Sequence, residues 1–173
     1  TPEPLIEKQL VEEQIEPIQI TMETFFDNSS PILGNPNAEI TLVEFGDYQC
    51  HFCNVYFHNT EHKIFENYVM EGKVNIIFKD YTIIGPDSVV AAHAAHCAGE
   101  QGKFWEYHNT LYNNWDGEET GWAGQENVVR FAQANRLVIS TPEDAGLDRF
   151  YAQMRKFDNF LKHKFGIKQG KKR

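Results

Sequence analysis

A pair of cysteines between an apolar run and an amphipathic run is the feature that most restricts how this chain can fold. Residues 40–46 read ITLVEFG and are apolar nearly throughout, which is typical of a central strand buried on both faces. Cys50 and Cys53 follow, and a second apolar run over residues 74–81 predicts another strand. Strand, helix and strand with both strands apolar indicate a parallel β–α–β unit. The predicted core-facing stripe of the helix consists of Cys53, Tyr56, Phe57, Thr60, Ile64 and Tyr68.

The C-x-x-C spacing places both thiols at the start of this predicted helix. Unpaired backbone N–H groups and the positive end of the helix dipole favour thiolate over thiol there, so we expect Cys50 to be the more acidic and more nucleophilic cysteine. The two intervening residues let Cys53 reach back to Cys50, so that a mixed disulfide with a substrate can be resolved within the same protein. This context favours thiol–disulfide exchange.

Two other uses of the cysteines stay open, namely half of a zinc site and a structural disulfide. A zinc site normally needs four grouped ligands, and no second C-x-x-C or C-x-x-H follows in the sequence. The third thiol, Cys97, lies in an Ala-rich helical stretch where a small buried residue is expected. A disulfide that closes so short a loop removes little entropy from the unfolded chain. Redox chemistry is therefore favoured over both alternatives.

Histidine pairs raise a separate metal hypothesis. His58 and His62 are four residues apart on the predicted first helix, and His93 and His96 lie beside Cys97. Neither pair has a carboxylate or a third ligand at motif spacing, so surface or packing roles are favoured over copper or zinc binding. We expect no metal and no cofactor beyond the cysteines.

The charge of the chain is negative and unevenly distributed. A net charge of -9 over 173 residues argues against a nucleic-acid binder. The first twenty residues carry five Glu against one Lys together with three prolines, which is typical of a solvated leader, and lysines crowd the other end. The sequence has no apolar run long enough to span a membrane. Because the chain begins at Thr1 rather than Met, a targeting segment could have been removed, and secretion with a membrane anchor is one hypothesis.

The remaining segments add one strand and several helices to the prediction. Turn-forming residues indicate loops over residues 27–37 and 113–124. Alanines and bulky apolar residues predict helix from Pro86 onward. The expected elements are a first strand over residues 17–26, helical structure over 86–112, a helix over 125–135 and another that begins at Thr141-Pro142. We therefore expect an α/β core followed by a helical subdomain.

Three motifs taken in order resemble a known family. FGDYQCHFC at residues 45–53, DY at 80–81 and AAHAAHCAGEQGKFWEYH at 91–108 are similar to the DsbA-type thiol–disulfide oxidoreductases, over about residues 18–167. The resemblance implies a thioredoxin-like fold with an inserted helical domain. It also implies an extracytoplasmic protein that forms or reshuffles disulfides in unfolded secreted polypeptides, and a membrane or soluble partner that recycles its cysteines. Cys50 would attack and Cys53 would resolve the mixed disulfide.

The resemblance also implies roles for residues around the cysteines. Glu44 matches a buried acid that acts as a proton relay, and its place between apolar neighbours in a predicted central strand argues for burial over an exposed sheet edge. Lys79 is either its charge partner or a lysine that reaches solvent from a strand end. An imidazolium at His51 would favour the Cys50 thiolate and a more oxidising disulfide, and the alternative is a surface turn that touches substrate.

The chain departs from the family pattern in two places. His51 stands where the family commonly has proline, and no proline follows Pro142, although the family places a cis-proline, a hairpin and a closing helix after a segment like residues 165–167. We therefore expect the C-terminal hairpin and helix to be missing and residues 40–45 to form an exposed edge that promotes self-association. The alternative function is then that of a degenerate thioredoxin-like binding module. The predicted divisions are a flexible acidic leader (1–16), a thioredoxin-like core (17–85), a helical insertion (86–165) and a basic tail (166–173).

Overall fold

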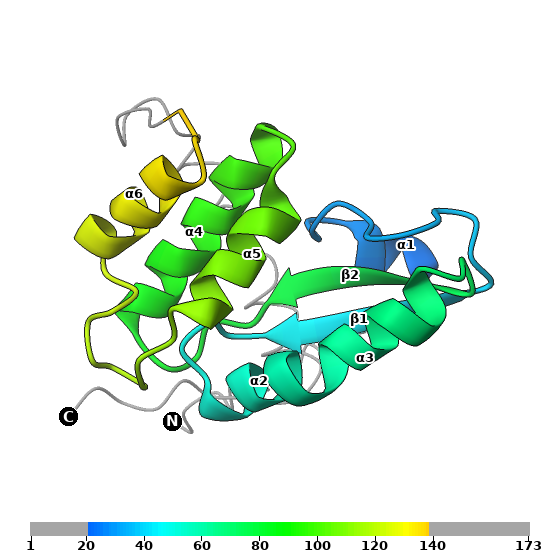
Figure 1. Cartoon of the computed structure of the whole chain (residues 1–173), viewed down its shortest axis with the longest axis horizontal. Coiled ribbons are helices and arrows are strands. Elements are labelled where there is room, and N and C mark those ends of the chain that lie inside the picture. The colour runs from blue at the N-terminus through cyan, green and yellow to red at the C-terminus, as the bar shows by residue number, and fades with distance from the viewer. Residues whose placement is uncertain (1–20, 139–173) are drawn as a thin grey trace, which may run out of the picture.

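A computed structural model describes residues 21–138 of this 173-residue chain. Two adjacent strands have one long helical segment along them, and three further helices gather at one end of the strands (Figure 1). The elements in chain order are α1 (Met22–Phe26), β1 (Ile40–Gly46), α2 (His51–Tyr56), η1 (Phe57–Glu61), α3 (His62–Ile64), η2 (Phe65–Val69), β2 (Val74–Asp80), α4 (Pro86–Glu100), α5 (Phe104–Asn113) and α6 (Gln125–Ala134).

The predicted parallel β–α–β unit is confirmed. β1 pairs in parallel with β2, in a register that runs from Ile40 opposite Val74 to Gly46 opposite Asp80. β2 is the more buried strand, and Ile76 has no exposed surface. The expectation that β1 is buried on both faces is wrong for the described residues, because Ile40 is 60% and Phe45 44% exposed. Within residues 21–138 the sheet has two strands, so β1 has a strand neighbour on one side only. Self-association through this strand stays a prediction.

The helical segment from His51 to Val69 contains two π-helical stretches, η1 and η2. A π-type turn holds more residues than an α-turn, so it rotates the following side chains away from the faces that a 3.6-residue period predicts. The predicted stripe is correct at Phe57, which is fully buried, and wrong at Tyr68, which is 50% exposed. Val69 takes the inward position and is 4% exposed.

The predicted first strand is partly replaced by a helix. Within residues 17–26, the last five form α1, and residues 17–20 lie outside the described part of the chain. The Thr24 hydroxyl accepts a hydrogen bond from the Thr21 backbone N–H at 3.4 Å, and the Thr24 N–H donates to the Thr21 carbonyl at 3.1 Å. These local bonds begin a helical turn, which alternation of apolar residues could not reveal.

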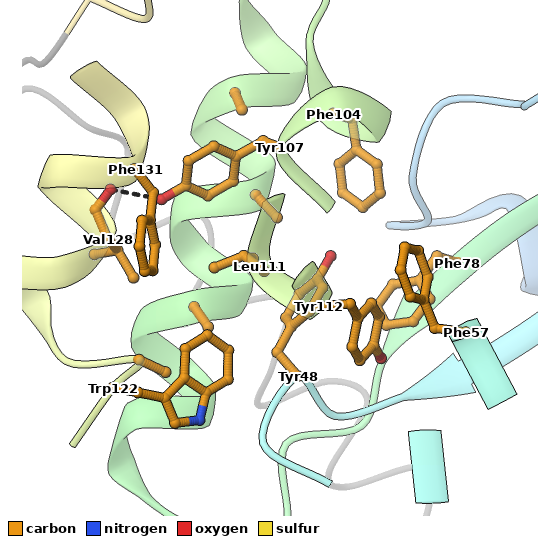
Figure 2. Packing of buried hydrophobic residues seen from close by; sticks show 14 residues of the cluster. Tyr48, Phe57, Phe78, Phe104, Tyr107, Leu111, Tyr112, Trp122, Val128 and Phe131 are labelled. Carbon is orange, nitrogen blue, oxygen red and sulfur yellow. Dashed lines mark hydrogen bonds between the residues drawn. The ribbon is translucent and has the colours of Figure 1, made fainter. Parts of the chain in front are cut away.

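The predicted helices and the loop between them are confirmed in α4, α5 and α6. A single apolar cluster joins them to the β–α–β unit, as Figure 2 shows, and the Tyr107 hydroxyl donates to the Val128 carbonyl at 2.6 Å inside it. Because the helices and the strands share this cluster, their relative position is fixed by packing. Its members are Tyr48, Phe57, Phe78, Ala91, Ala95, Ala98, Phe104, Tyr107, Leu111, Tyr112, Trp122, Ala123, Val128 and Phe131.

Several sequence predictions fall on residues outside the described range. These are the acidic leader, the helix that begins at Thr141-Pro142, the basic tail and the expected loss of the hairpin and closing helix. The division into a core ending at residue 85 and a helical insertion stays a prediction. Among the helices of residues 21–138, none combines the length and the apolar character needed to cross a membrane.

Candidate active site

The loop between β1 and α2 is held by the buried side chain of Asp47. One carboxylate oxygen accepts the Gln49 N–H at 2.8 Å, and the other accepts the N–H groups of Ile83 at 2.8 Å and Ile84 at 3.0 Å. The Asp47 carbonyl accepts the Cys50 N–H at 3.0 Å. One side chain thus fixes the segment that leads into the cysteines and ties it to the segment before α4.

Gly46 allows this loop to start close to the core. A Cβ at Gly46 would collide with the ring of Phe78 and lie 3.2 Å from the Tyr112 hydroxyl oxygen. The chain can therefore turn toward Cys50 only where no side chain is present. Gly46 and Asp47 belong to the motif at residues 45–53, and the sequence alone indicated no role for either.

Cys50 is the residue that caps the start of α2, and Cys53 lies one turn into the helix. Both thiols are free and partly buried, and the Asn54 N–H donates to the Cys50 carbonyl at 3.0 Å. Burial raises the pKa of Cys53 to about 12. A hydrogen bond with the Asp47 backbone lowers this pKa, whereas a hydrogen bond with Cys50 and the charges of Cys50 and Glu44 raise it further. The second cysteine therefore holds its proton firmly in the dithiol state.

Glu44 lies on β1, close enough to Cys53 for its charge to act on that thiol. Burial, and secondarily the charge of Glu61, raise its pKa from 4.5 to about 8. Its Oε2 atom is buried and has no hydrogen-bond partner within residues 21–138. The charge of Glu44 in turn acts on Cys53 and on the phenol of Tyr56, whose pKa is raised to about 12 mainly by burial. Glu44 is thus a carboxyl group that can gain or lose a proton near neutral pH, close enough to Cys53 for its charge to act on that thiol.

A second buried acid, whose charge acts on Glu44, lies next to a buried histidine. Glu61 of η1 and His108 of α5 are both buried, with 3.7 Å between Glu61 Oε2 and His108 Nε2. The hydroxyl of Tyr48 and His108 Nδ1 lie 3.1 Å apart. Sequence reasoning missed both Glu61 and His108 as site residues. Only the spacing of Glu61, two helical turns after Cys53, could have suggested that it faces the same interior.

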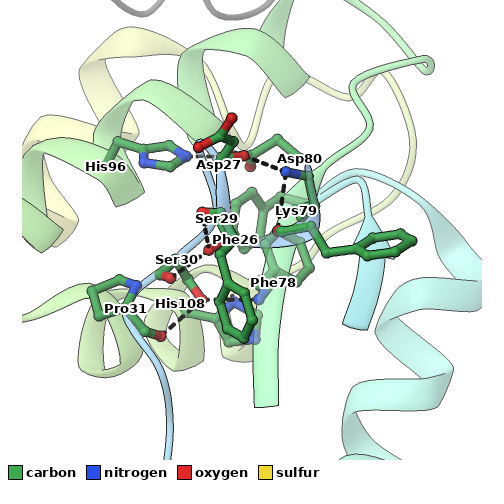
Figure 3. A network of polar contacts seen from close by, with 12 residues as sticks. Phe26, Asp27, Ser29, Ser30, Pro31, Phe78, Lys79, Asp80, His96 and His108 are labelled. Atoms are coloured by element: carbon green, nitrogen blue, oxygen red, sulfur yellow. Dashed lines mark hydrogen bonds and ion pairs between the residues drawn. The ribbon is translucent and has the colours of Figure 1, made fainter. Parts of the chain in front are cut away.

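Lys79 is not the charge partner of Glu44. Glu44 is paired with Phe78 in the register, so Lys79, the next residue, points to the opposite face of the sheet. Its Nζ donates to the carbonyls of Phe25, at 3.3 Å, and of Asp27 (Figure 3). Burial lowers its pKa, and the charges that oppose this are those of Asp27 and Asp80. The side chain is buried, so it does not reach solvent from the strand end either.

Three histidines of the two predicted pairs have packing or ion-pair partners. His58 and His62 lie edge-on against the ring of Phe57, with centroids 4.9 and 4.8 Å away. His96 Nε2 lies 2.6 Å from Asp80 Oδ2. Burial lowers the pKa of His96, but the hydrogen bond and charge of Asp80 outweigh it and raise the pKa overall. Over residues 21–138, no group of three or more His, Cys, Asp or Glu side chains is placed to hold a metal ion.

A loop after α5 lies against the cysteine motif. His51 is exposed, its ring centroid is 5.6 Å from that of Trp115, and its backbone N–H donates to Glu118 Oε1 at 2.9 Å. The Trp115 indole N–H donates to the Gln49 carbonyl at 2.8 Å. The sequence predicted this segment only as a loop, because the contact joins residues more than sixty positions apart.

Comparison with known proteins identifies the family of this chain. A family model described as thioredoxin matches residues 27–163. The chain is 28% identical over 141 residues to disulfide bond formation protein D of Bacillus subtilis, covering 79% of this chain and 63% of that protein. It is 29% identical over 109 residues to a probable disulfide bond formation protein D of Bacillus cereus, covering 62% of this chain and 50% of that protein. The chain thus spans between half and two thirds of the length of these relatives.

Solved structures are similar over most of the chain. The crystal structure of oxidised BdbD from Bacillus subtilis matches with a TM-score of 0.67 and 28% identity, over 80% of this chain and 77% of that one. The crystal structure of α-DsbA1 from Wolbachia pipientis matches with a TM-score of 0.66 and 20% identity, over 82% and 71%, and supports the fold alone. The fold is therefore thioredoxin-like α/β with a helical insert.

Proposed function

Because this chain belongs to the thioredoxin family, among its DsbA-like thiol–disulfide oxidoreductases, we propose that it forms or reshuffles disulfide bonds in other proteins through Cys50 and Cys53. The observation that carries the proposal is the asymmetry of the pair. Cys50 caps the start of a helix, whereas Cys53 lies one turn inside with its pKa raised to about 12, next to Glu44. One sulfur is therefore suited to exchange and the other to resolution.

The oxidising half-reaction follows from this arrangement. A substrate thiolate attacks Cys50 Sγ, the Cys50–Cys53 bond breaks, and the electron pair of that bond leaves on Cys53. The Cys53 thiolate then takes a proton from Glu44, whose pKa of about 8 keeps most of it protonated at pH 7. A second substrate thiolate attacks the substrate sulfur of the mixed disulfide. This attack forms the substrate disulfide and releases the Cys50 thiolate.

The same residues serve the reverse, reducing direction, which opens a wrong substrate disulfide so that another can form. The Cys50 thiolate attacks a substrate disulfide, and Cys53 resolves the mixed disulfide after passing its proton to the ionised form of Glu44. This step leaves Cys50–Cys53 oxidised and the two substrate sulfurs as thiols. Because the Cys53 thiol holds its proton up to pH of about 12, a nearby carboxylate that accepts the proton speeds this step. We propose that Glu44 transfers the proton in both directions and that His51 favours the Cys50 thiolate from the solvent side.

Compartment and partners follow from the chemistry proposed. Disulfides form and persist in oxidising compartments, so we place the protein outside the cytoplasm. Two curated relatives are named for disulfide bond formation, which supports unfolded secreted polypeptides as substrates. Each substrate disulfide leaves Cys50 and Cys53 reduced, so the cycle also requires a membrane or soluble partner that accepts two electrons from them.

An oxidative refolding assay tests the proposal. A reduced, unfolded secreted enzyme with several disulfides is the substrate, and regained activity is the readout. We expect the oxidised protein to accelerate refolding, C50S and C53S to lose that effect, and C97S to keep it. Cys97 is the matched control because its partly buried thiol lies outside the C-x-x-C pair, 3.6 Å from His93 Nε2. No acceleration by the unaltered protein would favour the binding module over the oxidoreductase.

A further inference from the structure

The loop after α5 holds the residues before α2 through the buried side chain of Gln49. The Gln49 carbonyl accepts the Trp115 indole N–H at 2.8 Å, and Gln49 Oε1 accepts the Glu119 backbone N–H at 3.0 Å. Gln49 Nε2 donates to Ser88 Oγ at 2.9 Å, which ties the same point to α4. The loop therefore has a fixed position over the cysteine motif, supported from two sides.

Within this loop Glu118 places a carboxylate directly on the reactive end of the helix. Its Oε1 atom accepts the backbone N–H of His51, the residue after Cys50, at 2.9 Å. Glu119 is its neighbour in sequence and makes no such contact. The Glu119 Oε1 atom instead lies toward Gly85, 3.4 Å from the place that a Cβ on that glycine would take.

In the dithiol state, the Glu118 carboxylate and a Cys50 thiolate compete for the N–H groups at the start of α2. A Cys50 thiolate is stabilised by the backbone N–H groups and the dipole at the start of α2. The Glu118 carboxylate occupies the first of those N–H groups, so it removes one donor and also repels the thiolate. The other ionisable groups that these contacts bring near this end are His51, Cys53, Asp47, Glu44 and Glu119. Asp47 already accepts three backbone N–H groups, so its charge is balanced by donors of its own.

We propose that Glu118 is a positioning residue that weakens the oxidising power of the Cys50–Cys53 pair, an inference that rests on the proposed redox function. In reduction by glutathione, two glutathione thiols become one glutathione disulfide and the Cys50–Cys53 bond takes up the electron pair. Of the two protons released, one goes to Cys53 and one to solvent, and Cys50 becomes the thiolate. Because Glu118 destabilises that thiolate, it shifts the equilibrium toward the enzyme disulfide.

The test compares E118Q with E119Q in glutathione redox buffers, with free thiols trapped and counted by mass. Glutamine keeps an oxygen that can accept the His51 N–H, so E118Q removes the charge and keeps this hydrogen bond. We expect the equilibrium constant for reduction of E118Q to rise about three- to tenfold, which corresponds to about 14–30 mV for a two-electron couple. E119Q should leave it unchanged. The rise should shrink in 1 M salt, since Glu118 is exposed.

A second readout separates the charge effect from a structural one. The rate at which a thiol reagent alkylates Cys50 should reach half its maximum at lower pH in E118Q than in the unaltered protein, with equal unfolding midpoints. An unchanged equilibrium constant and alkylation profile in E118Q, or equal shifts in E118Q and E119Q, would overturn the inference. If the unaltered protein shows no reversible transition, the proposed redox function fails, and the alkylation profile still decides the effect of Glu118.

Discussion

Replacing Glu44 with glutamine should change the pH dependence of stability in a direction that its burial fixes. Burial first, and then the charge of Glu61, raise the pKa of Glu44 from 4.5 to about 8. Between these values the folded protein binds a proton that the unfolded chain releases, so the free energy of unfolding falls as pH rises from 4.5 to 8. Below pH 4.5 both states are protonated and this loss is absent. E44Q carries no titrating group at this position and escapes the loss.

The size of the effect has an upper limit set by the shift. One pKa unit corresponds to about 1.4 kcal/mol, so a rise of 3.5 units from 4.5 to about 8 corresponds to about 5 kcal/mol above pH 8. Glu44 keeps some exposed surface, and water that enters the site on ionisation reduces the cost. We expect E44Q to gain about 1–3 kcal/mol relative to the unaltered protein between pH 4.5 and 8.5.

Urea unfolding of the reduced protein at several pH values measures this difference. The stability of E44Q minus that of the unaltered protein should rise steadily with pH and level off above pH 8. E66Q is the matched control, because Glu66 is an exposed carboxylate on the helical segment that follows the cysteines. A difference between E44Q and the unaltered protein that stays constant with pH, or that falls as pH rises, would refute the burial of an uncharged Glu44.

Three further predictions concern single contacts of the site. At pH 7 a thiol reagent should modify Cys50 and spare Cys53, whose pKa is raised to about 12, and peptide mass mapping that finds equal labelling would contradict this. D47A should lower the free energy of unfolding by about 2–4 kcal/mol because three N–H groups lose their acceptor, and urea unfolding within 0.5 kcal/mol of the unaltered protein would contradict it. Asp80 raises the pKa of His96, so the stabilisation from this ion pair should be present below pH 6.5 and lost as pH rises through the raised pKa. An H96Q variant whose free energy of unfolding depends on pH as that of the unaltered protein does would contradict this.

The β–α–β unit was predictable because its signals are local. Two apolar runs flank an amphipathic one, and parallel pairing follows from the length of the connection. Cys50, Cys53 and Glu44 could be proposed as a site from equally local signals, since they belong to one strand and one helix start. The family resemblance rested on the same short motifs.

What the sequence did not reveal depends on contacts between distant segments. Glu61 and His108 meet across the core from different helices, and Glu118 reaches His51 from a segment that its turn-forming residues predicted only as a loop. A charge pair of Lys79 with Glu44 was one of two alternatives because the two strands are adjacent. The alternation of side chains along the strands puts the two residues on opposite faces. The π-type turns that begin at Phe57 and Phe65 likewise leave no mark in the 3.6-residue pattern of the sequence.

A redox titration of the Cys50–Cys53 pair in glutathione buffers tests the central claim most directly, with free thiols trapped and read by mass. A working oxidoreductase predicts a reversible two-electron transition near or above about -200 mV, the range of disulfide-forming catalysts. A pair that stays oxidised at far lower potentials, or that never forms a disulfide, would contradict the account and leave the thioredoxin-like fold as a binding module.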